Sequence, residues 1–353
     1  LSKKNNDRYQ YIFPNFKYKK EIGIEKNYNG NFYFSTNGYQ KQYNTNNYQA
    51  VITNDFLFNS NNYISDKGLK SNYQILLKQD NSFTSTPLDD KDETNLYQSI
   101  LFKTEYPLVK KTENFDNYLK PIIATKFSPN NSKDISNKEL RLSYDNIFSF
   151  NRISSTRNIE EGRSVSVGVE YGKNNKKGNN IFKFNIANSI SDKKNSNLPS
   201  RSKLDQTRSD IVGKLEYQPS KILDINYNFS YDRDFNNSNY QSLSTNLKLG
   251  ILETKVNYLS QDNEIGNSEV IKSNFNLNFD NENSINFNTT KNLKTDFTEF
   301  YNLVYEYETD CLLASVEYKK KFYQDGSILP DKSLLFYLKF IPFAELRPQA
   351  AKL

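Results

Sequence analysis

The chain has 353 residues, a formal net charge of +6 and a hydrophobic fraction of 36%. This length fits one large all-β unit or two ordinary domains. No stretch approaches the ~18 consecutive apolar residues of a membrane helix, which excludes a protein that spans a membrane with helices but not a β-barrel. The sequence contains no histidine, which excludes Ser-His-Asp triads and His-ligated zinc. The positive charge is dispersed and forms no basic block typical of nucleic-acid binding.

The N-terminal part shows a weak pattern. The sequence contains no methionine and does not begin with a signal peptide, so we expect residue 1 to lie inside a longer protein. Residues 81–94 and 128–139 are both long and polar, and we interpret both as connections. They would lie at opposite ends of a sheet if a single strand separated them.

The clearest alternation lies further along the chain. In 222–232, which reads ILDINYNFSYD, every second residue from Leu223 is apolar or aromatic and the residues between are polar. A period of two predicts a β-strand with one apolar and one polar face. The same alternation occurs in five more segments: 164–171, 243–251, 271–280, 285–288 and 334–340. In all we expect roughly 17 strands, several of them longer than the ~5–6 residues typical of globular proteins.

The connections after residue 190 alternate between long and short. The long ones are 191–206, 233–239, 260–269 and 323–331, and the short ones are 218–221, 250–253, 281–284 and 308–311. Outer-membrane barrels have short periplasmic turns and longer extracellular loops. The rhythm therefore favours a barrel over a soluble β-sandwich or β-helix.

The composition of the polar faces indicates what they contact. They are rich in Asn, Ser, Lys and Asp. An unpaired amide buried in a dry core costs about 1–3 kcal/mol, which a row of such residues on many strands would multiply. We therefore expect the polar faces to line a hydrated lumen and the apolar faces to contact lipid. The predicted fold is all-β, a large antiparallel transmembrane β-barrel fragment over 1–343, followed by a C-terminal periplasmic tail over 344–353.

Four stretches resemble one family. Residues 146–171 (NIFSFNRISSTRNIEEGRSVSVGVEY) resemble its strand–loop–strand, and residues 198–232 resemble its Leu-Pro loop followed by two strands. Residues 305–323 (YEYETDCLLASVEYKKKFY) are similar to its cysteine-bearing hairpin, and 11–18 (YIFPNFKY) to the entry into its middle strands. The family is the LPS-assembly protein of the bacterial outer membrane (LptD, also called organic solvent tolerance protein). The resemblance covers the C-terminal part of that barrel.

The resemblance implies a function and a set of partners. Members of the family receive lipopolysaccharide from a periplasmic transport bridge and insert it into the outer leaflet through a lateral gate. The implied partners are lipopolysaccharide, membrane lipid, an outer-membrane lipoprotein plug (LptE-like), and the bridge, which binds through an N-terminal domain missing from this chain. No cofactor, metal or nucleic acid is implied.

Three sets of residues are candidate sites. The resemblance implies that Cys311, in a short turn, forms a disulfide with the missing N-terminal domain; the oxidising periplasm fits this role. The last strand would form one side of the lateral gate through Leu334, Phe336, Leu338 and Phe340, although an ordinary closing strand would look the same. Arg152, Arg157 and Arg163 flank a predicted outer loop and are candidate lipid-phosphate contacts, although surface ion pairs are the commoner role.

Two other classes of protein are alternatives. A passive porin or a ligand-gated uptake barrel would share the strand and loop patterns but would need no periplasmic cysteine. An outer-membrane enzyme such as a phospholipase would need a nucleophile and a base, and the lack of histidine argues against it. The adjacent Glu160 and Glu161 would point apart on a strand and do not form a catalytic pair. We assign no catalytic residue.

Overall fold

The structure is a computed structural model. It describes residues 11–22, 29–43, 47–86, 89–129, 132–136, 141–153, 155–262, 268–322, 331–340, 344–346 and 351–352. These residues form 21 β-strands and a single turn of 3-10 helix, η2 (Arg201–Lys203). None of the described helical residues belongs to a segment with the length and hydropathy needed to cross a bilayer.

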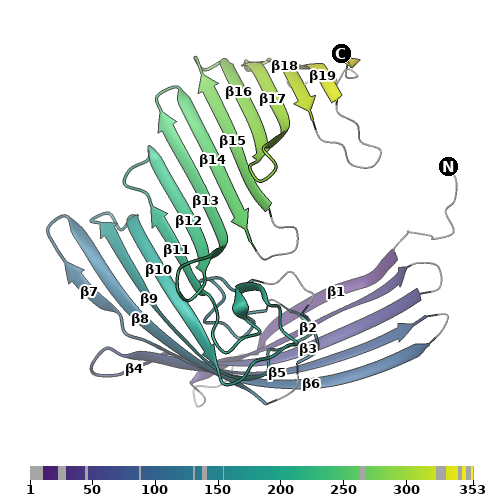
Figure 1. The fold of residues 1–353 in the computed structure, drawn as a ribbon, viewed down its shortest axis with the longest axis vertical. Helices are drawn as coiled ribbons and strands as arrows, with labels where there is room; N and C mark the ends of the chain where they lie inside the picture. Colours follow the sequence, from purple (N-terminus) through teal and green to yellow (C-terminus); the bar gives the residue numbers. More distant parts are fainter. Residues whose placement is uncertain are drawn as a thin grey trace. The chain divides into compact units, whose positions relative to one another are not determined.

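The long strands alternate in direction along the chain (Figure 1). In order they are β1 (Tyr11–Ile22), β2 (Gly30–Tyr43), β3 (Asn47–Ser60), β4 (Tyr63–Ile64), β5 (Lys70–Ser85), β6 (Asp90–Glu105), β7 (Leu108–Lys111), β8 (Phe115–Ser128), β9 (Gly162–Asn175), β10 (Asn180–Ser191), β11 (Ile211–Tyr217), β12 (Leu223–Tyr231), β13 (Ser238–Leu249), β14 (Leu252–Gln261), β15 (Ser268–Asn278), β16 (Asn283–Asn292), β17 (Phe297–Glu308), β18 (Leu312–Lys321), β19 (Asp331–Phe340), β20 (Ala344–Leu346) and β21 (Ala351–Lys352). Strands β4, β7, β20 and β21 are four residues or shorter, which leaves 17 long strands among the described residues.

The chain divides into two compact units. Unit 1 comprises Leu1–Leu108, Leu119–Glu170 and Ala187–Ile211, and unit 2 comprises Val109–Tyr118, Tyr171–Ile186 and Val212–Leu353. In unit 1, β1, β2, β3, β5, β6 and β8 pair in this order, each antiparallel to the next. In unit 2, β12 to β19 pair in chain order and are also antiparallel. The structure confirms the predicted all-β antiparallel fold class.

Unit 2 has two chemically different faces. Aromatic side chains of neighbouring strands stack on one face: Phe275 lies 6.3 Å from Phe287, which lies 6.1 Å from Tyr301, measured between ring centroids. We call this the apolar face of unit 2. The opposite face, which we call its polar face, carries asparagines, lysines and glutamates at the alternating positions of the same strands. This confirms the predicted two-faced strands.

Unit 1 also exposes an apolar face. Its exposed residues are Tyr73, Ile75 and Leu77 of β5, Leu96, Ile100 and Phe102 of β6, and Leu119, Ile123 and Phe127 of β8. The opposite face of the same strands is buried, although it carries Lys78, Asp80 and Lys126. Residues between β8 and β9, and between β10 and β11, fold over this face, which we call the covered face. The prediction that every polar face is open to water was therefore wrong for unit 1.

Four smaller expectations were also wrong. Residues 81–94 are not a long connection, because β5 continues to Ser85 and β6 begins at Asp90. Both β6 and β8 lie between the 81–94 and 128–139 segments, so these segments lie at the same end of the strands. Residues 146–152 form turns rather than the strand that the resemblance implied. The row over 243–251 ends early, because Gly250 has a φ of +57° and makes the turn into β14.

Candidate functional site

A connection of unit 1, whose described residues form no strand, contributes two buried charged side chains, Arg152 and Glu160. We call residues 129–161, between β8 and β9, the β8–β9 segment. Its apolar side chains are buried at irregular intervals: Ile135, Leu142, Tyr144, Ile147, Phe150, Ile153 and Ile159. Phe150 and Ile159 pack with Leu76, Tyr97 and Leu101 of the covered face in one hydrophobic cluster. This apolar contact docks the segment onto the sheet.

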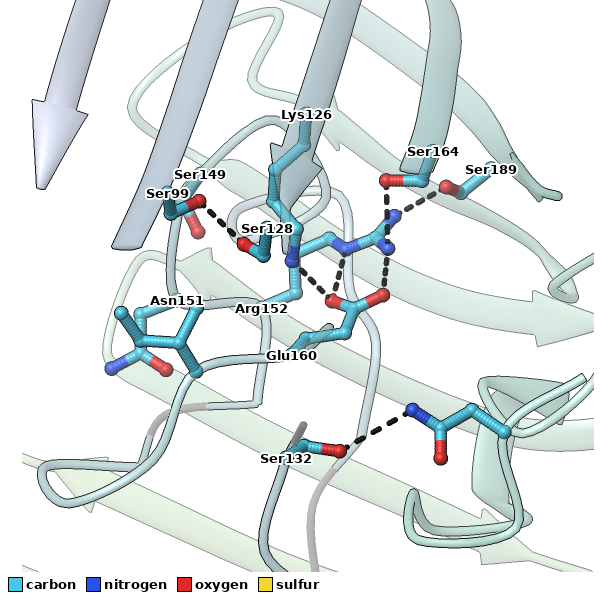
Figure 2. A network of polar contacts seen from close by, with 12 residues as sticks. Ser99, Lys126, Ser128, Ser132, Ser149, Asn151, Arg152, Glu160, Ser164 and Ser189 are labelled. Carbon is cyan, nitrogen blue, oxygen red and sulfur yellow. Dashed lines mark hydrogen bonds and ion pairs between the residues drawn. The ribbon is translucent and has the colours of Figure 1, made fainter. Parts of the chain in front are cut away.

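A buried ionic triad fixes the end of this segment (Figure 2). The carboxylate of Glu160 accepts hydrogen bonds from the Nζ of Lys126, at 2.7 Å, and from the Nε of Arg152, at 2.9 Å. The side chains of all three are at least 96% buried. Burial alone would raise the pKa of Glu160, but the charges of Arg152 and Lys126 lower it to about 2. Glu160 is therefore an anion between two cations.

The second guanidinium edge of Arg152 is also satisfied. Arg152 donates to the hydroxyl of Ser164 at 3.1 Å, to that of Ser166 at 3.3 Å, and to that of Ser189. Ser164 and Ser166 lie on β9, and Ser189 lies on β10. Together with Lys126 of β8, these contacts tie the segment to three strands. Because a buried charge without partners is costly, the arrangement holds the segment in one position.

A second ionic cluster lies around Asp80 of β5. Its carboxylate accepts hydrogen bonds from the Nε of Arg157, at 3.0 Å, the Nζ of Lys133, at 3.0 Å, and the hydroxyl of Thr53, at 2.9 Å. Lys133 also contacts Glu93 of β6 at 3.0 Å. Lys133 lies near the start of the β8–β9 segment and Arg157 near its end. The cluster therefore fastens the segment at a second place.

A polar cavity of about 900 Å³ lies beside the second cluster. Strands β2, β3, β5 and β6 line it together with residues 133–135 and 155–158. Hydroxyl and amide groups predominate in the lining, and three cations are balanced by three carboxylates: Lys91, Lys133, Arg157, Asp89, Glu93 and Asp134. Such a lining stays hydrated and carries no strong net charge.

The residues between β10 and β11, 192–210, fold next to the β8–β9 segment. Asn195 donates to the hydroxyl of Ser132 at 3.3 Å, and the backbone N–H of Ile135 donates to the carbonyl of Asn197 at 2.8 Å. Leu198 and Leu204 are 3% and 4% exposed. The two connections therefore form one folded layer over the covered face.

The sequence predicted three arginines as lipid-phosphate contacts, and the structure places them in different surroundings. Arg152 and Arg157 have carboxylate partners inside unit 1. Arg163, at the start of β9, is exposed and lies over the ring of Phe127 on the apolar face, 5.5 Å from its centroid. These surroundings favour a structural role for Arg152 and Arg157. For Arg163, the contact with a lipid phosphate stays a prediction.

The other candidate residues lie in unit 2. Cys311 is an exposed free thiol in the turn between β17 and β18. This turn lies at the same end of the strands as the short connections 250–251 and 279–282, as the alternation predicts. The four predicted gate residues, Leu334, Phe336, Leu338 and Phe340, lie on β19, whose one edge pairs with β18. The disulfide and the gate both stay predictions.

The edge of β19 that faces away from β18 pairs with two short strands. Phe340 to Leu338 pair with β20, and Ser333 and Leu334 pair with β21. These two strands belong to the 344–353 segment, which the sequence predicts to be a periplasmic tail. The structure places their backbone along β19.

The sequence contains a signal for the packing of the β8–β9 segment but none for its ion pairs. Irregularly spaced apolar residues within a long polar connection, such as Ile147, Phe150 and Ile153, are the signal of a packed connection. The partners of Glu160 and Asp80 had no such signal, because the residues that they join lie up to 77 positions apart in the sequence. Such pairs depend on the register of the strands.

Comparison with known proteins places the chain in a family. Residues 15–297 match the family described as LptD, LPS transport system D. The match covers most of the chain, and the chain belongs to this family, as its motifs predicted. The family places it in the bacterial outer membrane. A search of curated proteins finds no match.

The chain is also similar to solved structures, at low identity. The siderophore receptor PirA from Acinetobacter baumannii has 8% identity and a TM-score of 0.45, and the match covers 97% of this chain and 66% of that chain. A mutant of the ferric enterobactin receptor PfeA from Pseudomonas aeruginosa has 9% identity and a TM-score of 0.39, with 92% of this chain and 61% of that chain covered. A mutant porin from Rh. blastica has 9% identity and a TM-score of 0.30, with 89% of this chain and 95% of that chain covered. This chain therefore spans less than two thirds of the length of either receptor.

Proposed function

We propose that the chain is the C-terminal barrel part of an outer-membrane translocon that inserts lipopolysaccharide into the outer leaflet. Membership of the LPS transport system D family carries this proposal. The two faces of the strands fit it, because an amphipathic lipid with a large saccharide needs a hydrated surface next to a lipid-facing one. In this proposal the saccharide follows the polar faces, and the lipid leaves at a lateral gate that includes β19. The protein works as a transport component and not as an enzyme.

The β8–β9 segment supports a sealed state of the lumen. Two ionic clusters hold it against the covered face, through Glu160 and through Asp80. A translocon that carries a large ligand only intermittently must not leak small solutes between transport events. We infer that this segment is one part of the seal and that a lipoprotein plug supplies another.

The proposal is tested by depletion of the full-length parent protein in its own bacterium. Lipopolysaccharide on the cell surface and the uptake of small hydrophilic solutes are measured in parallel. Loss of surface lipopolysaccharide with no fall in solute uptake is the expected result. A fall in solute uptake with normal surface lipopolysaccharide would instead support the passive porin or uptake barrel.

A second test addresses the proposed disulfide between Cys311 and an N-terminal domain. The full-length parent protein and its Cys311→Ser variant are compared on non-reducing and reducing gels. A shift in mobility on reduction that the variant lacks supports an interdomain disulfide, because Cys311 is exposed at the end where the short turns lie. Equal mobility of both proteins under both conditions would remove the disulfide from the proposal.

A further inference from the structure

A second cavity lies on the polar face of unit 2, outside the site described above. Its volume is about 390 Å³. Two lysines line it, Lys272 of β15 and Lys319 of β18. Side-chain amides from four neighbouring strands line it as well: Asn257, Asn274, Asn288 and Asn302. All of these residues belong to unit 2.

The two lysines differ from the basic residues of unit 1 in their partners. On the covered face, Lys78, Lys126 and Arg152 each contact a carboxylate within 4.0 Å. Within the described part of the chain, neither Lys272 nor Lys319 forms an ion pair. A cation on a polar face that forms no ion pair with the protein is available to an anionic ligand.

Three of the four asparagines form a row across the sheet, two residues along the strands from Lys272. Asn274, Asn288 and Asn302 are consecutive partners in the strand register, and Lys319 continues the row on β18. Asn274 donates to the side chain of Asn288. The Oδ1 atom of Asn302 is buried and accepts no hydrogen bond within the described residues.

The positions of the two lysines limit the ligand. Strands β15 and β18 are three strand spacings apart, and Lys272 lies two residues along β15 from Asn274, which is in the row of Lys319. The backbones of the two lysines are therefore separated by about 16 Å. A single phosphate could contact both lysines only if their side chains bent toward each other over the asparagine amides. Two anionic groups on a short saccharide fit the spacing, because the sugar hydroxyls would then lie over the asparagine row. Hydroxyls and amides pair both as donors and as acceptors.

We propose that this cavity binds an oligosaccharide that carries two phosphate groups, one at Lys272 and one at Lys319, with the sugar rings on the asparagine row. The proposal deepens the proposed function, on which it rests, because it assigns the anionic saccharide of the transported lipid to named residues. These are residues of unit 2 and not the arginines that the sequence suggested.

The test measures binding by the full-length parent protein in detergent micelles. The probe is a β-linked glucose disaccharide with a phosphate at each end, and its dissociation constant is measured by calorimetry at low salt. The Lys272→Gln/Lys319→Gln variant should bind the probe at least about tenfold more weakly, since each lysine loses a charge-assisted contact. The matched control is Lys248→Gln, because Lys248 lies on the same face, outside the cavity lining, and contacts Glu253 at 3.3 Å. The control should stay within about twofold of the parent.

Three results would overturn the site. They are equal affinity of the double variant and the parent, equal affinity for the disaccharide without phosphates, and equal affinity for inorganic phosphate alone. Thermal unfolding of the double variant is measured to show that it is folded. Because binding is measured without transport, normal binding together with normal surface lipopolysaccharide after depletion would reject the proposed function and keep the site.

Discussion

At the scale of single residues, Glu160 is the anion on which two buried cations depend. Lys126 and Arg152 both direct their charge to its carboxylate. Removal of one member of a buried ion pair leaves the other charge without compensation, which typically costs about 3–5 kcal/mol. The triad is therefore expected to be far more sensitive to substitution than the exposed ion pairs of the same sheet.

We expect Glu160→Gln to loosen the β8–β9 segment from the covered face. The expected change is a loss of about 3 kcal/mol or more in the free energy of unfolding, with faster proteolysis within 141–161. The measurement is denaturant unfolding combined with limited proteolysis of the full-length protein. Glu113→Gln is the control, because Glu113 is exposed in the β7–β8 turn. Equal effects of both substitutions would contradict the role given to the triad.

The same group predicts a dependence on pH. The pKa of Glu160 in the folded protein is about 2, below its ordinary value of 4.5. A lowered pKa gives stability that is complete above pH ~4.5 and is lost as the pH falls toward 2, because the unfolded state binds the proton first. Thermal unfolding at pH 3 and pH 6 should show a fall in stability at pH 3 that is smaller in Glu160→Gln. An identical fall in both proteins would show that other carboxylates dominate.

At the scale of the elements, close contacts between a glycine and an aromatic ring bring neighbouring strands together. A Cβ atom on Gly213 of β11 would lie 2.1 Å from the Cζ of Phe229 on β12. Phe229 is 9% exposed and lies against Tyr227 and Tyr231. The ring has no room to move away from an added methyl group without disturbing its neighbours.

Gly213→Ala should therefore destabilise unit 2 by about 1–3 kcal/mol. Phe229→Leu in the same chain should recover part of this loss, since the smaller side chain leaves room for the methyl group. Unfolding of the two single variants and the double variant gives the coupling free energy between the positions. Additive effects of the two substitutions would contradict a direct steric contact.

Periodicity predicts some elements well and others not at all. The strands with alternating residues, such as β12 and β15, follow from a pattern that depends only on the two faces of the sheet. Strands β5 and β6 were missed at their polar ends, because the partners of Asp80 and Glu93 come from the β8–β9 segment. The position of that segment depends on contacts between distant residues, which local sequence does not encode.

At the scale of the whole molecule, family membership and the two chemically different faces support one account. The exposed apolar faces suit lipid, and the polar face of unit 2 suits a hydrated saccharide. Motif order was sufficient to predict the family, since the stretches 146–171, 198–232 and 305–323 follow one another along the chain. The ion pairs of Arg152 and Arg157 could not be predicted from the sequence. A charged residue in a predicted loop gives no information about a carboxylate partner inside the fold.

The central claim is that lipopolysaccharide moves along the polar face, and site-specific photo-cross-linking in living cells tests it most directly. A photoreactive amino acid is placed at Asn286, on the polar face of β16, or at Tyr305, on the apolar face of β17. The two positions are at matched depth, because Asn286 pairs with Val304. Adducts with the saccharide of lipopolysaccharide are expected at Asn286 and not at Tyr305. Adducts at Tyr305 alone, or at neither position while surface lipopolysaccharide is normal, would contradict the account.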